Sequence, residues 1–364
     1  MKIKKTYILP AEWYPQDAIQ LTWPHVQTDW APYLDDITQT YLQLADTITK
    51  YEHLIVATPE PDHVWQLLKN NLADEQIEKI LFYLIDSNDT WARDHGGITT
   101  INPLTRALTV LDFRFNGWGE KFEWEKDNQI TKQLFVYQRE SSNKNFALSA
   151  CIEENDDFVL EGGSIESDGE GTVFTTSQCL MAPHRNQPLT QIQIEQQLKE
   201  RLGVDRVVWF DHGNLIGDDT DGHIDTIVRI CPDHTLLYVG TPNKDDEHYA
   251  DFKALEDQIR RWVDTHYSLQ SESKYKMIAL PFPDAIYDEG ERLPATYANF
   301  LILNGAVIVP TYNQPEKDQK AIKIIQDVFP TRKIIGIDSR TIIRQHGSIH
   351  CLTMQYPQGI LLKK

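Results

Sequence analysis

TYANFLILNGAVIVPT, residues 296–311, is the stretch that decides the fold. Its two apolar halves flank Asn304-Gly305, a pair that strongly indicates a two-residue turn between antiparallel strands. The segment QPEKDQKAIKIIQDVF (314–329) then has a helical pattern, and RKIIGID (332–338) has the pattern of a strand. This part of the chain is therefore predicted to form one strand-strand-helix-strand unit.

The same order of elements recurs before this stretch. Three earlier hairpins are expected, each followed by a helical pattern and a further strand. The expected hairpins join 97–101 to 107–114, 158–166 to 172–176, and 223–230 to 235–240; their helices cover 123–137, 189–203 and 246–267; and their last strands cover 146–151, 204–210 and 275–283. We expect Gly203 to cap the second of these helices.

A fifth unit is divided between the two ends of the sequence. The strand patterns at 349–357 and 18–24 belong to it, and a helix at 33–51 and a strand at 53–58 complete it. Residues 1–364 are therefore predicted to form a single α/β domain, in which five units close into a ring through strands from both chain ends. Such a ring is propeller-like and has one pocket on its axis.

The composition excludes several classes of function. The formal net charge is -19 and no basic patch occurs, so nucleic acid is not an expected partner. No run of about eighteen apolar residues is present, and the apolar run after the first lysines is too short for a secretory signal. We therefore expect a cytoplasmic protein with no membrane partner.

The four cysteines, Cys151, Cys179, Cys231 and Cys351, lie far apart and form no Cys-x-x-Cys pair. A disulfide framework or a zinc ribbon is therefore not expected. Cys179 and Cys231 are interpreted as ordinary buried side chains. Cys351 alone has the same interpretation, because a free cysteine usually acts as a small hydrophobic residue.

Polar residues interrupt the predicted units at nearly the same point of each. They are Asp94 before the first hairpin, Glu161 in the second, His223 and Asp225 in the third, Tyr297 and Asn299 in the fourth, and His350 and Cys351 in the fifth. Equivalent points of a ring meet at its axis, so these side chains are expected to share one pocket.

Each of these residues also has a structural interpretation. Asp94 beside Arg93 is compatible with a local ion pair. Glu161 follows an apolar run, and a buried glutamate requires a partner. His223 and Asp225 are expected on one face of a strand, where they form a metal half-site, an acid/base pair or a core pair. The functional hypothesis depends on the coincidence of their positions.

Seven segments resemble, in order, the agmatine deiminase and bacterial-type peptidylarginine deiminase family of guanidino-group-modifying enzymes. They are AEWYPQDAIQLTWP (11–24), WARDHGGI (91–98), FNGWGEKF (115–122), LEGGSIESDGEGTVFTTSQCL (160–180), GDDTDGHIDTIVRI (217–230), RLPATYANFLILNGAVIVP (292–310) and GSIHCLTMQYP (347–357). The resemblance covers nearly the whole chain. It implies the pentein fold, a five-bladed pseudo-symmetric α/β propeller of ββαβ units, which agrees with the repeat.

The resemblance also implies a role for each candidate residue. Cys351 would attack the guanidinium carbon, while Asp94 and Asp225 hold the cation. His223 would give a proton to the departing ammonia and then take one from water. Glu161 either orients His223 or contacts the guanidinium.

Further residues are expected to bind the substrate. Trp91 and Trp118 are candidates for the pocket wall, Trp118 because aromatic faces attract cations. Asp219 is a candidate partner for an amine at the far end of the substrate. No metal and no cofactor is expected.

The expected function is hydrolysis of agmatine, or a related arginine derivative, to a ureido product plus ammonia, a step of putrescine and polyamine metabolism. The expected partners are a small cationic guanidine and, as a homodimer, a second copy of the chain. The alternatives are a peptidylarginine deiminase, an amidinotransferase, a zinc hydrolase that uses His223, Asp225, Cys351 and Glu161 as ligands, and a non-catalytic binder of cationic peptides.

Overall fold

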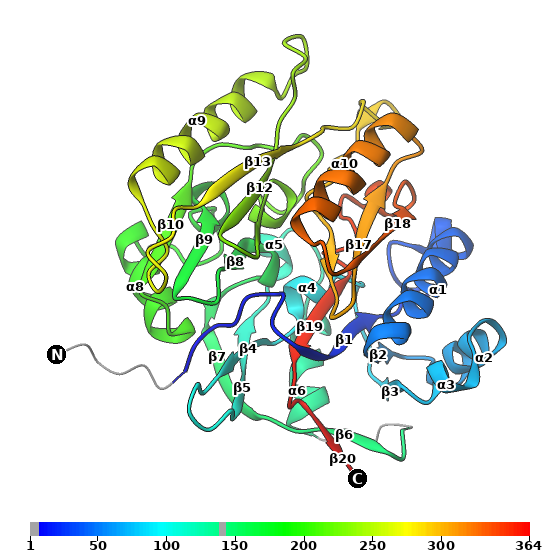
Figure 1. The fold of residues 1–364 in the computed structure, drawn as a ribbon. Coiled ribbons are helices and arrows are strands. Elements are labelled where there is room, and N and C mark those ends of the chain that lie inside the picture. Colours follow the sequence, from blue (N-terminus) through cyan, green and yellow to red (C-terminus); the bar gives the residue numbers. More distant parts are fainter. Residues whose placement is uncertain (1–6, 138–142) are drawn as a thin grey trace.

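The computed structural model describes residues 7–137 and 143–364 (Figure 1). The lysines at positions 2, 4 and 5, which entered the argument against a secretory signal, lie outside these residues. Among the helices in the described part, none has the length and apolar character needed to cross a membrane.

The described residues form five sheets of three or four strands, and the strand order of each repeats one scheme. Two strands pair antiparallel, and a parallel strand then adds to the second of them. The sheets are β19 (Thr353–Pro357), β1 (Gln16–Thr22), β2 (His53–Thr58) and β3 (Ile80–Leu84); β4 (Ile98–Ile101), β5 (Leu108–Arg114) and β7 (Cys151–Val159); β8 (Ile165–Ser167), β9 (Thr172–Thr176) and β10 (Arg206–Phe210); β11 (Val228–Cys231), β12 (Thr235–Val239) and β13 (Lys276–Leu280); and β16 (Leu301–Ile302), β17 (Ala306–Thr311) and β18 (Lys333–Asp338). The fold is mixed α/β, as predicted.

Helices connect the second and third strands of these sheets. They are α1 (Leu34–Tyr51), α6 (Ile130–Phe135), α8 (Gln191–Leu202), α9 (Tyr249–Thr265) and α10 (Pro315–Val328). Figure 1 shows α1, α8, α9 and α10 on the outside of the molecule. The predicted cap of α8 is confirmed, because Gly203 has a left-handed conformation that glycine adopts without strain.

Some elements were not predicted. Two helices, α2 (Pro61–Asn71) and α3 (Asp74–Ile77), lead into β3 at the edge of the first sheet. The strand expected at 146–151 was assigned to the wrong sheet. Its first residues form β6 (Phe146–Leu148), which pairs with β20 (Leu361–Lys363), and β7 is the third strand beside β4 and β5.

Four strands begin later than predicted, and this correction affects the site. The strands expected from residues 158, 223, 296 and 349 begin at Ile165, Val228, Leu301 and Thr353. In the residues just before two of these strands, side chains form hydrogen bonds with backbone carbonyl groups. Ser164 Oγ donates to the carbonyl of Glu161 before β8, and Thr226 Oγ1 donates to the carbonyl of His223 before β11. These bonds favour short 3₁₀ turns over ladder pairing.

His223 and Asp225 are therefore not on one face of a strand, as the two-residue period predicted. His223 precedes a 3₁₀ turn at Ile224–Thr226, which contains Asp225. The two side chains still come close to the same centre, because the turn directs them there.

A strand near the end of the sequence, β19, pairs with the first strand of the chain, β1. β19 and β1 are antiparallel, with Gln20 opposite Met354, and Figure 1 shows them side by side. The buried Tyr356 hydroxyl donates to Gln20 Oε1 over 2.7 Å. This pairing fixes the position of β19, and Cys351 lies in the turn directly before that strand.

Candidate active site

A cavity of about 190 Å³ contains five of the predicted site residues in its wall. They are Trp91, Asp94, Trp118, Asp219 and Cys351. Asp29, Asp89, Phe122 and His346 also line it. The cavity therefore joins a thiol, several carboxylates and aromatic side chains.

Cys351 lies in the turn before β19 and is buried. Its Sγ lies 3.4 Å from Asn299 Oδ1, which also accepts the backbone N–H groups of Cys351 and His350. Burial, with the charges of Asp225 and Asp94, raises the pKa of the Cys351 thiol well above its usual range. Without a cation the thiol is therefore held in its neutral form.

Asp94 is fixed by two donors. It lies in the short helix α4 (Ala92–His95), where Oδ2 accepts from Trp118 Nε1 at 3.0 Å and Oδ1 accepts from the backbone N–H of Gly163 at 3.1 Å. Burial raises the pKa of the Asp94 carboxyl to about 6 despite the neighbouring His223. Asp94 is therefore positioned for a cation while its charge is only partly compensated.

His223 lies between two carboxylates. Its Nδ1 is 3.6 Å from Asp94 Oδ1 and its Nε2 is 4.0 Å from Glu161 Oε2. Burial opposes its protonation, but the charges around it, Asp94 foremost, raise the pKa of His223 well above its usual range. Both ring nitrogens are buried, and among the described residues neither makes a hydrogen bond of normal geometry, so the contacts with the two carboxylates are ion pairs.

Glu161 has the partner that a buried glutamate requires. Arg185 Nε donates to Oε1 at 3.0 Å and to Oε2 at 3.3 Å, and both side chains are fully buried. Arg185 Nη1 also donates to Asp221 at 2.6 Å. The sequence argument missed Arg185, although a buried glutamate is itself a signal that a basic partner exists.

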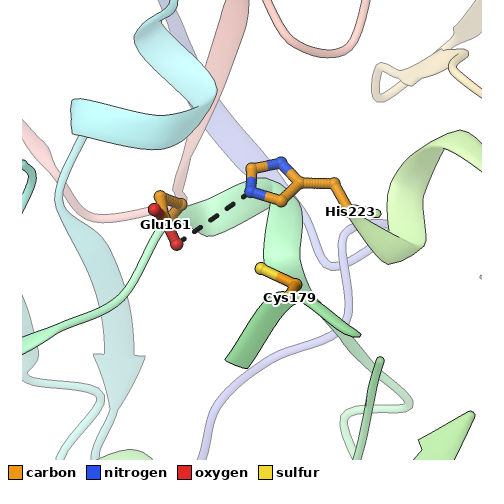
Figure 2. A group of neighbouring side chains, drawn as sticks. All are labelled: Glu161, Cys179 and His223. Atoms are coloured by element: carbon orange, nitrogen blue, oxygen red, sulfur yellow. Dashed lines mark ion pairs between the residues drawn. The ribbon is translucent and has the colours of Figure 1, made fainter. Parts of the chain in front are cut away.

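Cys179 lies beside this pair, in α7 (Ser177–Leu180). Figure 2 shows Glu161 and His223 pointing toward one another, with the Cys179 thiol close to both. The ligand atoms of the three residues lie within 4.8 Å of one another, as do those of Glu12, Glu166 and His350. The sequence analysis interpreted Cys179 as an ordinary buried side chain and did not predict that it lies beside Glu161 and His223.

These two groups have donor sets that could hold a metal ion. In each, an arginine already pairs with the carboxylates: Arg185 with Glu161, and Arg229 with Glu12 and Glu166. The absence of a metal requirement stays a prediction.

Asp225 is fully buried and has one oxygen in use. Oδ2 lies 2.6 Å from His350 Nδ1, while Oδ1 has no hydrogen-bond partner among the described residues. Burial opposes ionisation, but the hydrogen bond and charge of His350 outweigh it and lower the pKa of Asp225. Asp225 is therefore an ionised carboxylate with one free oxygen.

Gly163 marks the point where these groups converge. A Cβ atom on it would lie 2.6 Å from His223 Nδ1, 2.8 Å from Asp94 Oδ1 and 3.2 Å from Asp225 Oδ2. Only a residue without a side chain leaves room for the three groups to approach each other.

The chain is similar to known proteins over nearly its whole length. Residues 8–357 match the family model of the Porphyromonas-type peptidyl-arginine deiminases. The chain belongs to that family. The agmatine deiminase of Pseudomonas aeruginosa is 30% identical over 372 residues, which cover 96% of this chain and 95% of that protein.

Solved structures of similar chains support the same family. A C. jejuni agmatine deiminase with substrate bound is 33% identical, has a TM-score of 0.85 and matches over 97% of each chain. A Porphyromonas gingivalis protein, provisionally named an arginine deiminase, is 44% identical with a TM-score of 0.88 and covers 98% of this chain and 100% of its own.

Proposed function

We propose that the protein is an agmatine deiminase, which hydrolyses the guanidinium group of agmatine to a ureido group and ammonia. One observation carries the proposal: Asp94 meets His223 and Asp225 around Gly163, and the same Asp94 lines a cavity together with Cys351. A nucleophile, two carboxylates and an acid/base residue are the groups that this reaction requires.

The carboxylates bind the guanidinium. This group is planar and cationic, and its N–H groups donate in a fork that carboxylate oxygens match. Asp94 presents a carboxylate in the cavity wall, and Asp225 has Oδ1 without a partner. The bound cation offsets the negative charges that hold the Cys351 thiol neutral, so binding favours the thiolate.

The thiolate of Cys351 attacks the guanidinium carbon and forms a C–S bond. His223, as an imidazolium, gives a proton to the leaving nitrogen, and ammonia departs from the tetrahedral adduct. The neutral His223 then takes a proton from water, which attacks the thiouronium carbon. Breaking of the C–S bond releases the ureido product and restores the thiol.

The carboxylates of the cavity favour a substrate with a second cation. Besides Asp94, the wall contains Asp29, Asp89 and Asp219. Burial and the nearby charge of Asp29 raise the pKa of Asp89 to about 7. The ammonium of agmatine would relieve this repulsion, whereas the α-carboxylate of free arginine would add to it.

We also propose that the five sheets are blades of a pentein propeller formed by this single domain. Each sheet has the same strand scheme. Asp94, Glu161, Asp225, Asn299 and Cys351 each precede the first strand of a different sheet. If the five sheets are arranged in a ring, the residues that precede their first strands would meet at the centre of the ring.

The test is a panel of agmatine, free arginine and an arginine peptide blocked at both ends, scored for ammonia and ureido product. We expect the highest kcat/KM with agmatine. A higher kcat/KM with the peptide would make the protein a peptidylarginine deiminase. Amidine transfer to an added amine without ammonia release would make it an amidinotransferase.

A further inference from the structure

His350 is a buried ionisable residue that the mechanism above does not use. It directly precedes Cys351, and its exposed fraction is 1%. Its Nδ1 lies 2.6 Å from Asp225 Oδ2 and its Nε2 lies 2.8 Å from Glu12 Oε2. The ring therefore bridges a carboxylate of the candidate site and a carboxylate behind it.

The contacts place His350 in a layer of charged groups. Its Nδ1 faces Asp225 and its Nε2 faces Glu12, and Nε2 also lies 3.2 Å from Arg229 Nη2. Arg229 completes the layer: Nη2 donates to Glu12 Oε2 at 2.5 Å and Nε donates to Glu166 Oε1 at 2.7 Å. His350 is therefore held between two carboxylates, and Arg229 supports the rear one.

The backbone of His350 is held as firmly as its ring. Its N–H donates to Asn299 Oδ1 at 2.9 Å, and its carbonyl accepts from Arg93 Nε at 3.4 Å. A ring fixed in this way holds Asp225 by Oδ2, and in the part of the chain that the structure describes Oδ1 of that carboxylate has no partner.

We propose that His350 is a positioning residue, which acts through Asp225 by holding its Oδ2 and presenting Oδ1 to the substrate guanidinium. Glu12, from the segment before β1, positions the ring of His350 from behind. This inference rests on the proposed function, because it assigns a task to Asp225 in guanidinium binding.

The charged groups around these residues determine the expected effect of pH. Glu12, Asp225 and Arg229 contact His350, and Arg93 and Glu166 also belong to the surrounding charges. Asp225 also faces His223 and lies near Asp94 and Cys351. Without the charge on residue 350, burial would dominate at Asp225 and its carboxylate would ionise only at higher pH.

The experiment compares wild-type protein with His350→Gln, which fills similar space and can still donate one hydrogen bond but has no charge. We expect kcat/KM for agmatine to fall about 10²-fold. The acidic limb of the profile of kcat/KM against pH should move to higher pH by about one unit, because a second carboxylate must now ionise.

A matched control is His248→Gln. His248 is also 1% exposed and pairs with a carboxylate, Asp246, at 2.9 Å, but it does not contact Asp225. It should lower the melting temperature without moving the acidic limb. If His350→Gln folds and keeps the wild-type limb, His350 has only a structural role and the proposal is overturned.

Glu12→Gln provides a second test if His350→Gln does not fold. It leaves the contact between His350 and Asp225 in place but removes the charge behind the ring. We expect a smaller shift of the acidic limb in the same direction, and an unchanged limb would overturn the proposal. Wild-type protein that releases no ammonia from any guanidine in the panel would instead overturn the proposed function, and the two failures are thus distinguishable.

Discussion

Gly163→Ala tests the convergence of the site with a single methyl group. Gly163 does not have a positive φ, so alanine can adopt its backbone conformation without strain. The added Cβ would lie 2.6 Å from His223 Nδ1 and 2.8 Å from Asp94 Oδ1. The whole effect of the substitution therefore comes from crowding at the candidate catalytic groups.

The magnitude follows from the distances. Relieving the contact with His223 to an ordinary 3.4 Å requires a movement of about 0.8 Å. A misplacement of about 1 Å costs roughly 10²-fold in rate, equal to about 2.7 kcal/mol of transition-state stabilisation. Overpacking of this kind costs about 1–3 kcal/mol of the free energy of unfolding. We therefore expect effects of similar size on the rate and on the free energy of unfolding.

The assay measures ammonia release from agmatine and the free energy of unfolding in urea on the same preparation. Gly240→Ala is the matched control, because its Cβ would lie 3.7 Å from Ala279 Cβ, an ordinary contact, and its φ is not positive. We expect the control to keep wild-type kcat/KM. If folded Gly163→Ala keeps kcat/KM within about threefold of wild type, His223, Asp94 and Asp225 do not meet around Gly163 during catalysis.

Four other outcomes are expected. Cys351→Ser should lose at least about 10³-fold in ammonia release but keep its fold, because a hydroxyl ionises far less than a thiol; clear residual turnover would remove Cys351 as the nucleophile. The kcat/KM of the wild type should rise with pH through about 6, where the Asp94 carboxyl becomes ionised, and a flat profile across that range would contradict this role. Dialysis against a strong chelator should leave ammonia release unchanged, and recovery of a lost activity by zinc would favour the hydrolase alternative. A cationic haloacetamidine should alkylate Cys351 much faster than a neutral haloacetamide of equal intrinsic reactivity, and equal rates would argue against an acidic pocket.

The elements that the sequence predicted best have strong local signals. The Asn304-Gly305 turn and the apolar spacing of 314–329 correspond to the β16–β17 hairpin and to α10. The strand starts were predicted poorly for an equally local reason. The backbone before β8 and β11 bonds to nearby serine and threonine side chains, and a hydrophobic pattern does not report such competition.

The candidate site shows a similar division. The equivalent positions of Asp94, Glu161 and Cys351 in their units predicted one shared pocket; Asp94 and Cys351 line one cavity, and Glu161 faces His223. The sequence did not reveal the charged partners of these residues, because such partners are close in space but distant in the sequence. Glu12 and His350, for example, are 338 positions apart in the sequence. A buried charge indicates that a partner is required but does not indicate where in the chain it lies.

The pairing of β1 with β19 has a consequence for the order in which the protein is made. Gln20 leaves the ribosome early, whereas its sheet partner Met354 emerges only after all the chain between them. The same delay separates Glu12 from His350. Cys351 is synthesised after the residues of the other four units, so a nascent chain cannot complete the site until β19 has emerged and paired with β1.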